Sequence, residues 1–158
     1  MRIGFASDIH RLVKGRHLIL SGVVVPFELG EEAHSDGDVV YHAVAESILG
    51  ALALGDLGKH FPDSDPKFKD IDSSIIVKSV VDMMKRHGCK INNIDVSITL
   101  EKPKLKDYIE KMRSNLAELL ETGLENVSIK AGTNERVDSL GRNEAVKADA
   151  IVLLKEAE

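Results

Sequence analysis

Residues 94–100 alternate between apolar and polar side chains, and this pattern constrains the fold more than any other stretch of the chain. The apolar set is Ile94, Val96, Ile98 and Leu100, and the polar set between them is Asp95, Ser97 and Thr99. A period of two places the sets on opposite faces of a β-strand. One face must therefore be covered by another layer. The polar face of this segment and of residues 127–131 either meets water or packs against the same face of neighbouring subunits around a shared axis, and both possibilities stay open.

The other segments are assigned by the same kind of periodicity. Further strands are predicted at 1–10, 126–135 and 145–157, and a hairpin at 17–27. Helices are predicted from Asp38, which is suited to cap a helix, to near Gly55, and at 73–87 and 105–123. The stretch 55–68 contains glycines and prolines and is expected to be a long loop. This order predicts one domain over residues 1–158 with an α+β fold, a sandwich of one mixed β-sheet plus a β-hairpin with helices packed on one face.

Composition limits the kinds of partner. The chain has 21 basic and 26 acidic residues, a net charge of −5 and no basic run, so no nucleic-acid partner is expected. No stretch approaches the roughly 20 apolar residues that span a bilayer, and the N-terminus lacks the apolar core of a signal peptide, so no membrane partner is expected. The single cysteine, Cys89, excludes an internal disulfide and is expected to be buried. A cytoplasmic location is therefore predicted.

Asp8 and His10 form a possible metal-binding pair. They stand two residues apart on an extended segment, so their side chains point to the same side. His42, in the first turn or so of the helix after Asp38, is a candidate third ligand. One carboxylate and two imidazoles suit zinc, with a fourth position open for water or substrate. Asp38 or Glu46 could accept a hydrogen bond from a ligating histidine. By spacing alone a purely structural role is favoured, because Asp-x-His pairs are common.

The turn AHSDGD (33–38) precedes this helix and offers a place for a phosphate. A helix N-terminus presents free N–H groups and the positive end of the helix dipole. Ser35 adds a hydroxyl, and His34, if protonated, can hydrogen-bond a phosphoryl oxygen. The alternative is that the aspartates of the turn, Asp36 and Asp38, only cap the helix.

Two more polar turns end strands, KPK (102–104) and GTNE (132–135). Strand ends of this kind often bind nucleotides, although short basic turns are also commonly just solvated. The three remaining histidines, His17, His60 and His87, are expected on the surface.

Six segments together carry a resemblance to one family: SDIH (7–10), AHSDGDVVYHAV (33–44), LGDLGKHFPDSDP (54–66), KPK (102–104), KAGTNE (130–135) and GR (141–142). In this order and over nearly the whole chain they resemble the 2-C-methyl-D-erythritol 2,4-cyclodiphosphate synthases of the non-mevalonate isoprenoid pathway. The resemblance implies a substrate with a cytidine diphosphate moiety, 4-diphosphocytidyl-2-C-methyl-D-erythritol 2-phosphate. Its 2-phosphate attacks the β-phosphorus of its own diphosphate, which releases CMP and closes the cyclic diphosphate. The resemblance also implies a homotrimer with active sites between adjacent subunits.

The resemblance further implies roles for individual residues. It assigns one zinc ion per chain to Asp8, His10 and His42, and a second divalent ion, Mg²⁺ or Mn²⁺, to Glu135. It gives His34 and Thr133 the stabilisation of the transition state. For the erythritol phosphate it implies Ser35, Asp56, Leu57, Gly58, Phe61, Pro62, Asp63, Ser64 and Asp65. For the cytidine pocket it implies residues within 100–106 and 131–134, namely Leu100, Pro103, Lys104, Leu105, Ala131, Gly132 and Asn134.

The C-terminal part departs from the family pattern. Gly132 stands where the family commonly has a hydroxyl residue, and the segment 136–146 differs from the usual sequence. In many members this region lines a central cavity that can hold an isoprenoid diphosphate. Arg142 is a candidate substrate-binding residue that is expected to face a phosphate group.

Two other functions compete with this interpretation. A zinc phosphohydrolase would use the same metal to activate water and would release linear phosphates. A non-catalytic trimer would only sense nucleotides or isoprenoid phosphates. Retention of all the implied metal and transition-state residues argues against the second.

Overall fold

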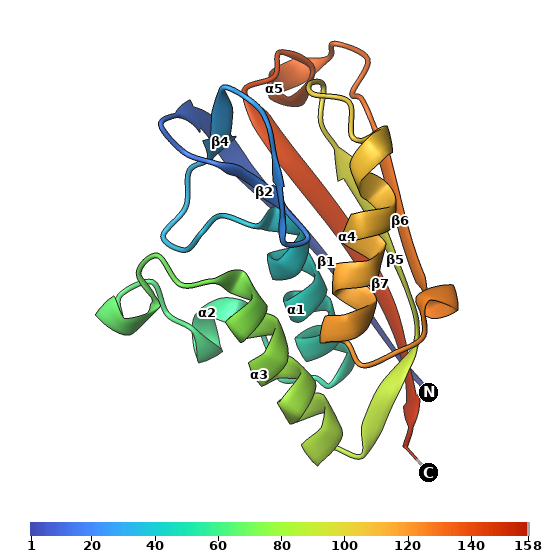
Figure 1. Ribbon diagram of the computed structural model, residues 1–158. Coiled ribbons are helices and arrows are strands. Elements are labelled where there is room, and N and C mark those ends of the chain that lie inside the picture. Colours follow the sequence, from blue (N-terminus) through green and yellow to red (C-terminus); the bar gives the residue numbers. More distant parts are fainter. Residues whose placement is uncertain (158) are drawn as a thin grey trace.

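The computed structural model describes residues 1–157 and is organised around a mixed five-stranded sheet. The strands lie in the order β4-β1-β7-β5-β6 (Figure 1). Their bounds are Leu29–Glu31 for β4, Arg2–Lys14 for β1, Ala145–Glu156 for β7, Cys89–Thr99 for β5 and Val127–Gly132 for β6. β5 and β6 run parallel, whereas the other neighbours are antiparallel. The predicted mixed sheet is thus confirmed.

The hairpin at 17–27 is also confirmed, as a separate two-stranded sheet of β2 (Leu18–Leu20) and β3 (Val23–Val25). Its turn is formed by Ser21 and Gly22, which both have positive φ angles, of 49° and 73°. Asp38 stabilises this turn, because its carboxylate accepts hydrogen bonds from the backbone N–H groups of both residues, at 3.0 and 2.7 Å. The hairpin is therefore anchored to the start of the first helix.

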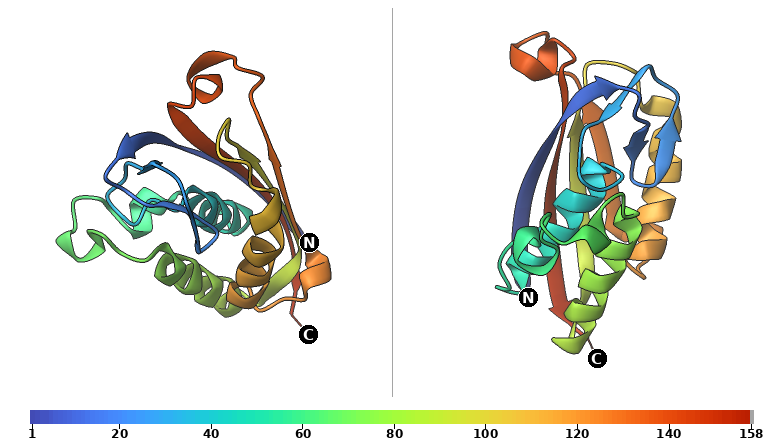
Figure 2. Two further views of the ribbon diagram at one scale, coloured as in Figure 1. Left: turned by 45° about the horizontal axis from the view of Figure 1, so that its top comes forward. Right: turned by 90° about the vertical axis from the view of Figure 1, so that its left-hand side faces the viewer.

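Three longer helices cover one face of the sheet, as predicted (Figure 2). They are α1 (Val39–Ala51), α3 (Ser73–Arg86) and α4 (Ile109–Leu119). Asp38 caps α1 through the N–H of Tyr41, at 3.1 Å, which confirms its predicted role. α1 ends earlier than expected, before Gly55, because Ala53 and Gly55 take positive φ angles of 58° and 91°.

Several short elements were not predicted. The expected loop 55–68 contains α2 (Leu57–His60) and the 3-10 turn η1 (Pro66–Phe68), each capped by an aspartate, Asp56 and Asp65. Strand β4 and helix α5 (Asp138–Gly141) were missed, because three or four residues are too few for periodicity to show. The expected helix 105–123 begins as the 3-10 turn η2 (Lys106–Tyr108), and a further turn, η3 (Leu124–Asn126), precedes β6.

The two faces of the sheet differ in burial. On the helix side, Ile94, Val96 and Ile98 are almost wholly buried. The apolar face of β5 is therefore covered by another layer, as its alternation predicted. The opposite face is open, and it is not only polar. Its large exposed side chains come from β1 and β7: Ile3, Phe5, Ile9 and Ile151, which are 67, 64, 52 and 43% exposed. An apolar sheet face of this kind is unusual for a surface that meets only water.

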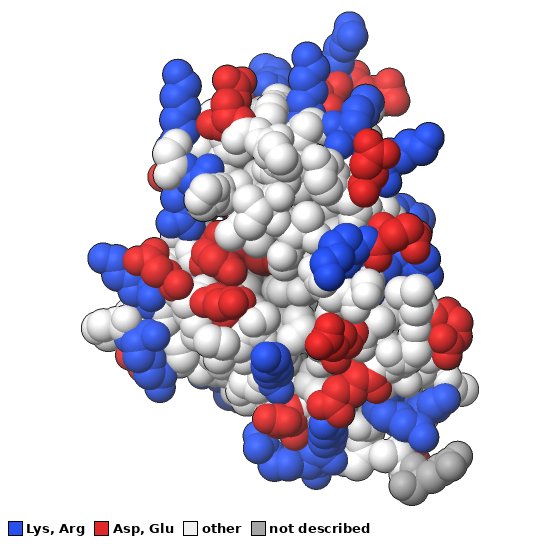
Figure 3. Space-filling model, viewed as in Figure 1, with Lys and Arg blue, Asp and Glu red and all other residues white. Residues whose placement is uncertain are grey.

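Charged side chains of both signs are interspersed on the face seen in Figure 3, around a largely uncharged area at its upper centre. Within residues 1–157, no helix is long and apolar enough to cross a membrane.

Candidate metal centre and active site

Asp8, His10 and His42 converge at one point on the helix side of the sheet. β1 carries the first two at alternate positions, and the first turn of α1 carries the third. Asp8 Oδ2 lies 3.0 Å from His10 Nε2 and 3.3 Å from His42 Nδ1. The three possible ligand atoms all lie within 4.8 Å of one another, and no other such group of three or more occurs in residues 1–157. The predicted triad is therefore brought together.

The hydrogen bonds of His10 suit a metal ligand. Its Nδ1 lies 2.8 Å from the carbonyl oxygen of Gly37 and so donates to it. The proton is thereby held on Nδ1, and the Nε2 lone pair faces Asp8. The expected acceptors, Asp38 and Glu46, do not have this role. Glu46 accepts a hydrogen bond from the N–H of Leu57 at 3.1 Å. Both carboxylate oxygens of Asp38 accept hydrogen bonds from backbone N–H groups.

The Oδ2 atom of Asp8 faces the two imidazoles, whereas Oδ1 accepts a hydrogen bond from the N–H of Ile9 at 3.0 Å. The Oδ2 atom is buried, and no donor reaches it in hydrogen-bonding geometry. Burial would raise the pKa of Asp8, but the attraction of His10 and His42 outweighs burial and lowers it well below its usual range. Burial likewise opposes charge on His10, yet Asp8 raises the pKa of that imidazole. A buried carboxylate oxygen and two ring nitrogens aimed at one point fit a divalent cation such as zinc.

A cavity of about 540 Å³ opens next to the triad. It is lined by the triad and by eight further residues that the sequence singled out: His34, Ser35, Glu46, Leu57, Gly58, Phe61, Pro62 and Asp63. His34 Nε2 is buried and has no hydrogen-bond partner, so it is available to a ligand. Most of the residues predicted to hold the erythritol phosphate are thus gathered around the metal-binding residues.

Three of the predicted residues do not line this cavity. Asp56 and Asp65 instead cap short helices, through the N–H groups of Lys59 and Lys67, and Ser64 lies in an exposed turn. Conversely, the cavity has walls that were not predicted: Glu32, Ala33, Phe68, Ile71 and Ile76. Ala33 is the first residue of the predicted turn 33–38 and Glu32 precedes it, so their position in the sequence was the signal that could have found them.

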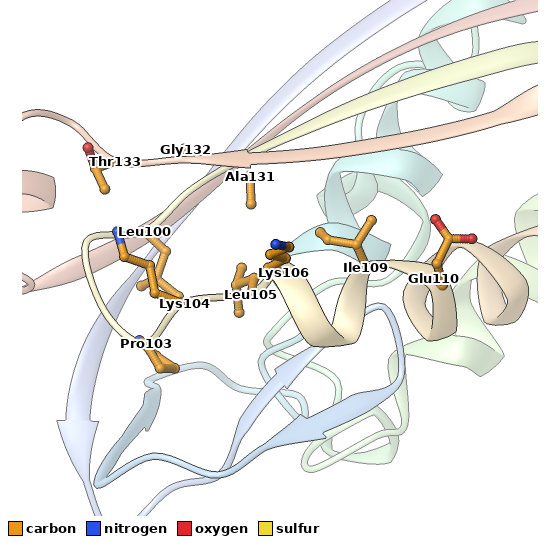
Figure 4. A pocket seen from close by; sticks show the side chains of 10 residues that line it. All are labelled: Leu100, Pro103, Lys104, Leu105, Lys106, Ile109, Glu110, Ala131, Gly132 and Thr133. Carbon is orange, nitrogen blue, oxygen red and sulfur yellow. The ribbon is translucent and has the colours of Figure 1, made fainter.

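A second cavity, of about 430 Å³, lies between the end of β6 and the chain that follows β5 (Figure 4). It is lined by Leu100, Pro103, Lys104, Leu105, Ala131, Gly132 and Thr133, all singled out from the sequence, together with Lys106, Ile109 and Glu110. A Cβ atom at Gly132 would meet nothing within 4 Å, so this wall has space for a side chain. The walls are mostly apolar and include two lysines, Lys104 and Lys106, and such a combination is suited to a nucleoside phosphate.

The remaining predicted residues lie in the turn beyond β6. Asn134 does not line the cavity, because its side chain donates to Val137 O and Asp138 Oδ1, at 2.8 and 3.0 Å. Glu135 is exposed, has a φ angle of 51° and accepts from Thr133 Oγ1 at 3.4 Å. Arg142 lines neither cavity and is paired with Glu144 at 2.9 Å.

The two cavities share no lining residue. The strand register places Asp8 beside Ala148, Ala148 beside Ile98 and Ile98 beside Ala131. Three strand spacings amount to roughly 14 Å, so the metal-binding residues and the second cavity lie well apart within one chain.

Comparisons with known proteins relate nearly the whole chain to one family. The model of the YgbB family matches residues 1–155. The 2-C-methyl-D-erythritol 2,4-cyclodiphosphate synthase of Brachyspira hyodysenteriae is 52% identical over 156 residues, which cover 99% of each chain. The structure of the bifunctional IspDF from Campylobacter jejuni is 37% identical, with a TM-score of 0.95; the match covers 99% of this chain and 42% of that longer one. A CDP-bound 2C-methyl-D-erythritol-2,4-cyclodiphosphate synthase is 33% identical, with a TM-score of 0.90 and coverage of 98% and 100%.

Proposed function

The chain belongs to the YgbB family, and from that membership we propose that it is a lyase-type enzyme that catalyses the reaction for which its relatives are named. It converts 4-diphosphocytidyl-2-C-methyl-D-erythritol 2-phosphate to 2-C-methyl-D-erythritol 2,4-cyclodiphosphate and CMP, in non-mevalonate isoprenoid precursor synthesis. The observation that carries the proposal is the convergence of Asp8, His10 and His42 in the wall of a cavity lined by most of the other residues predicted to bind the erythritol phosphate.

The reaction is an intramolecular phosphoryl transfer. An oxygen of the 2-phosphate forms a bond to the β-phosphorus, the bond from that phosphorus to the bridging oxygen breaks, and its electron pair leaves with CMP. The nucleophile belongs to the substrate, so the protein needs to position and neutralise charge and needs no activated serine or cysteine. This requirement agrees with a site built of metal ligands and hydrogen-bond donors.

We propose zinc as the ion held by Asp8 Oδ2, His10 Nε2 and His42 Nδ1. When bound, zinc supplies a Lewis acid that orients and polarises the β-phosphate. His34 Nε2 is buried and has no hydrogen-bond partner in the protein. It therefore forms a hydrogen bond with a phosphate oxygen of the substrate. Ser35 lies next to it and contributes its hydroxyl, and the walls formed by Leu57 and Phe61 exclude water from the folded-back substrate.

We further propose that Glu135 and Thr133 act on the diphosphate from the side of the second cavity. Thr133 lines that cavity, and its hydroxyl is directed to the carboxylate of Glu135. Mg²⁺ and Mn²⁺ are commonly held by a single carboxylate together with substrate phosphates, so an exposed glutamate at this position suffices as protein ligand. The cytidine occupies the cavity between β6 and η2.

The separation of the two cavities supports a homotrimer with shared active sites. Within one chain the metal-binding residues and the nucleotide cavity are too far apart to share a wall. We propose that the nucleotide cavity of one subunit lies beside the metal centre of the next. The exposed apolar side chains Ile3, Phe5, Ile9 and Ile151 on the open sheet face supply the surface that such an assembly buries. The cytoplasmic location stays a prediction from the sequence.

A product assay tests the proposed reaction. Purified protein loaded with zinc and Mg²⁺ is incubated with the linear substrate, and phosphorus NMR with mass spectrometry identifies the products. We expect the cyclic diphosphate and CMP in equal amounts. Linear phosphates that have gained water would instead identify a zinc phosphohydrolase and would overturn the proposal.

A further inference from the structure

The side of His42 that faces away from Asp8 is held by two serine hydroxyls. His42 Nε2 lies 2.9 Å from Ser73 Oγ and 3.1 Å from Ser35 Oγ. A metal can use Nδ1 of His42 only if the ring proton stays on Nε2. The partner of Nε2 therefore decides whether the nitrogen that faces Asp8 has a free lone pair.

The direction of the Ser73 hydrogen bond follows from its second partner. Ser73 Oγ lies 2.5 Å from Asp36 Oδ1, and an ionised carboxylate can only accept, so Ser73 donates its single proton to Asp36. Having no other proton, Ser73 must accept from His42. The chain Asp36–Ser73–His42 thus fixes the Nε2–H tautomer and leaves the Nδ1 lone pair facing Asp8.

Asp36 is itself fixed by backbone donors. Its Oδ1 also accepts from the N–H of Asp38 at 3.1 Å, and its Oδ2 accepts from the N–H of Ser73 at 3.1 Å. Ser73 is the first residue of α3 and is fully buried. Two further bonds join the same segments, from Asp70 N to His34 O at 2.7 Å and from Asp36 N to Ile71 O at 3.0 Å. The start of α3 is therefore rigidly attached to the turn 33–38.

Ser35 has a different hydrogen-bonding state. Its Oγ accepts from the N–H of Gly37 at 3.1 Å, and no protein acceptor binds its own proton. That proton is free for a ligand in the cavity that Ser35 lines. Of the two hydroxyls, Ser73 is the closer to His42 and the one whose proton is already committed.

We propose that Ser73 is a positioning residue for the metal centre: directed by Asp36, it holds His42 in the tautomer that presents Nδ1 to the metal. The inference rests on the proposed zinc site. It also assigns a purpose to the buried Ser73 and the partly buried Asp36, neither of which lines either cavity. Partners of this kind typically affect metal affinity on the order of 10- to 100-fold.

The first test is made without metal or substrate. In zinc-free protein labelled with ¹⁵N, long-range proton–nitrogen spectra at mildly alkaline pH report which ring nitrogen of each histidine carries the proton. We expect His42 to be protonated on Nε2 in the wild type, and to become a mixture of tautomers in Ser73→Ala. A wild-type His42 protonated on Nδ1, or an unchanged tautomer in Ser73→Ala, would overturn the proposal.

The second test measures zinc affinity by competition with a chelator. Ser73→Ala and Asp36→Asn should each bind zinc about 10 to 100 times more weakly than the wild type. Asn at 36 must turn its amide nitrogen toward one of the two backbone N–H groups and so loses one acceptor. Ser74→Ala, one residue further along α3, is the matched control and should bind zinc like the wild type. Wild-type affinity in Ser73→Ala would sink the inference, whereas a wild type that binds no zinc would refute the metal centre itself.

Discussion

At the scale of single residues, Gly37 connects the two histidines of the proposed metal centre through its backbone. Its carbonyl accepts from His10, and its N–H donates to Ser35, the neighbour of His42. Its φ angle is 89°, and a Cβ atom there would lie 2.8 Å from the Cβ of Glu31. Only glycine fits this position without strain.

Residue types and spacing made Asp8 and His10 candidate metal ligands, because they share one side of a strand, but a structural role was also compatible with that spacing. The family resemblance was needed to favour Asp8, His10 and His42 as ligands. The supporting atoms could not be found in this way. Gly37 acts through its carbonyl, which every residue has, and Ser73 comes from a helix 31 residues further along the chain than His42. Contacts of this kind depend on the tertiary fold and leave no local pattern.

Replacing His42 tests the metal centre. His42→Ala removes one of three ligands, and we expect zinc to be lost and kcat/KM to fall at least about a hundredfold, because the metal contributes several kcal/mol to transition-state stabilisation. The fold should persist, since buried residues such as Val44 and Ile48 hold α1 in place. Metal analysis and circular dichroism check both statements. His17→Ala, at an exposed histidine, is the control; full zinc occupancy in His42→Ala would contradict the ligand assignment.

Glu31 predicts a pH dependence of stability. Burial, reinforced by the negative charge of Asp38, raises the pKa of Glu31 from 4.5 to about 9. Between these values the native state keeps a proton that the unfolded chain releases. The free energy of unfolding therefore falls as pH rises, by up to about 1.4 kcal/mol per pH unit for this one proton. Burial also raises the pKa of Asp38, to about 6, with the same sign.

Glu31→Gln removes the titrating group, and with it the contribution of this proton to the pH dependence of the free energy of unfolding. Urea unfolding measured from pH 5 to pH 9 should show the variant gaining stability relative to the wild type as pH rises. Glu28→Gln, which removes a glutamate charge from the surface, is the matched control. A stability difference that stays constant over this range would show that Glu31 is ionised in the native protein.

At the scale of elements, the long periodic segments were predicted well and the short ones were not. The alternation in β5 extends over residues 94–100 and the helical spacing of α3 over its 14 residues, so burial leaves a repeated signal. β4 has three residues and pairs with the end of β1 through tertiary contacts alone. In the loop 55–68, Asp56 and Asp65 cap α2 and η1, and the expectation that they bind substrate stays a prediction. An aspartate in a polar turn has the same local pattern in both roles.

The end of β6 offers a test of nucleotide binding. At Gly132 a side chain would enter open space beside the proposed cytidine pocket. We expect Gly132→Ser to tighten binding of CDP, because one added hydrogen bond contributes about 1 kcal/mol, or roughly fivefold in Kd. Gly132→Ala is the control for backbone stiffening without a hydroxyl. Calorimetric titration of both variants decides; equal affinities would show that no ligand group lies within reach of position 132.

At the scale of the whole molecule, the open sheet face is the feature that one chain leaves incomplete. The sequence left two possibilities for this face, water or neighbouring subunits. Phe5, Ile9 and Ile151 favour the second, because their exposure in one chain is costly. The sequence pattern of β5, which is polar on that side, did not reveal this, since the apolar side chains come from β1 and β7.

Phe5→Glu tests the assembly. Each copy would place a carboxylate in the proposed interface, and burying it without a partner costs several kcal/mol. We expect the trimer found by light scattering for the wild type to dissociate, and activity to disappear with it, while Glu28→Gln on the outer surface stays trimeric. A wild type that is monomeric and fully active would refute the shared site.

The separation of the two cavities has a genetic consequence. In a trimer of the proposed kind, a site uses the metal ligands of one subunit and the nucleotide cavity of its neighbour. A chain with a defective metal centre and a chain with a defective nucleotide cavity could then complement each other when expressed together. Random mixing in equal amounts would restore about one quarter of the sites. Two inactive alleles would thus support growth together where neither does so by itself.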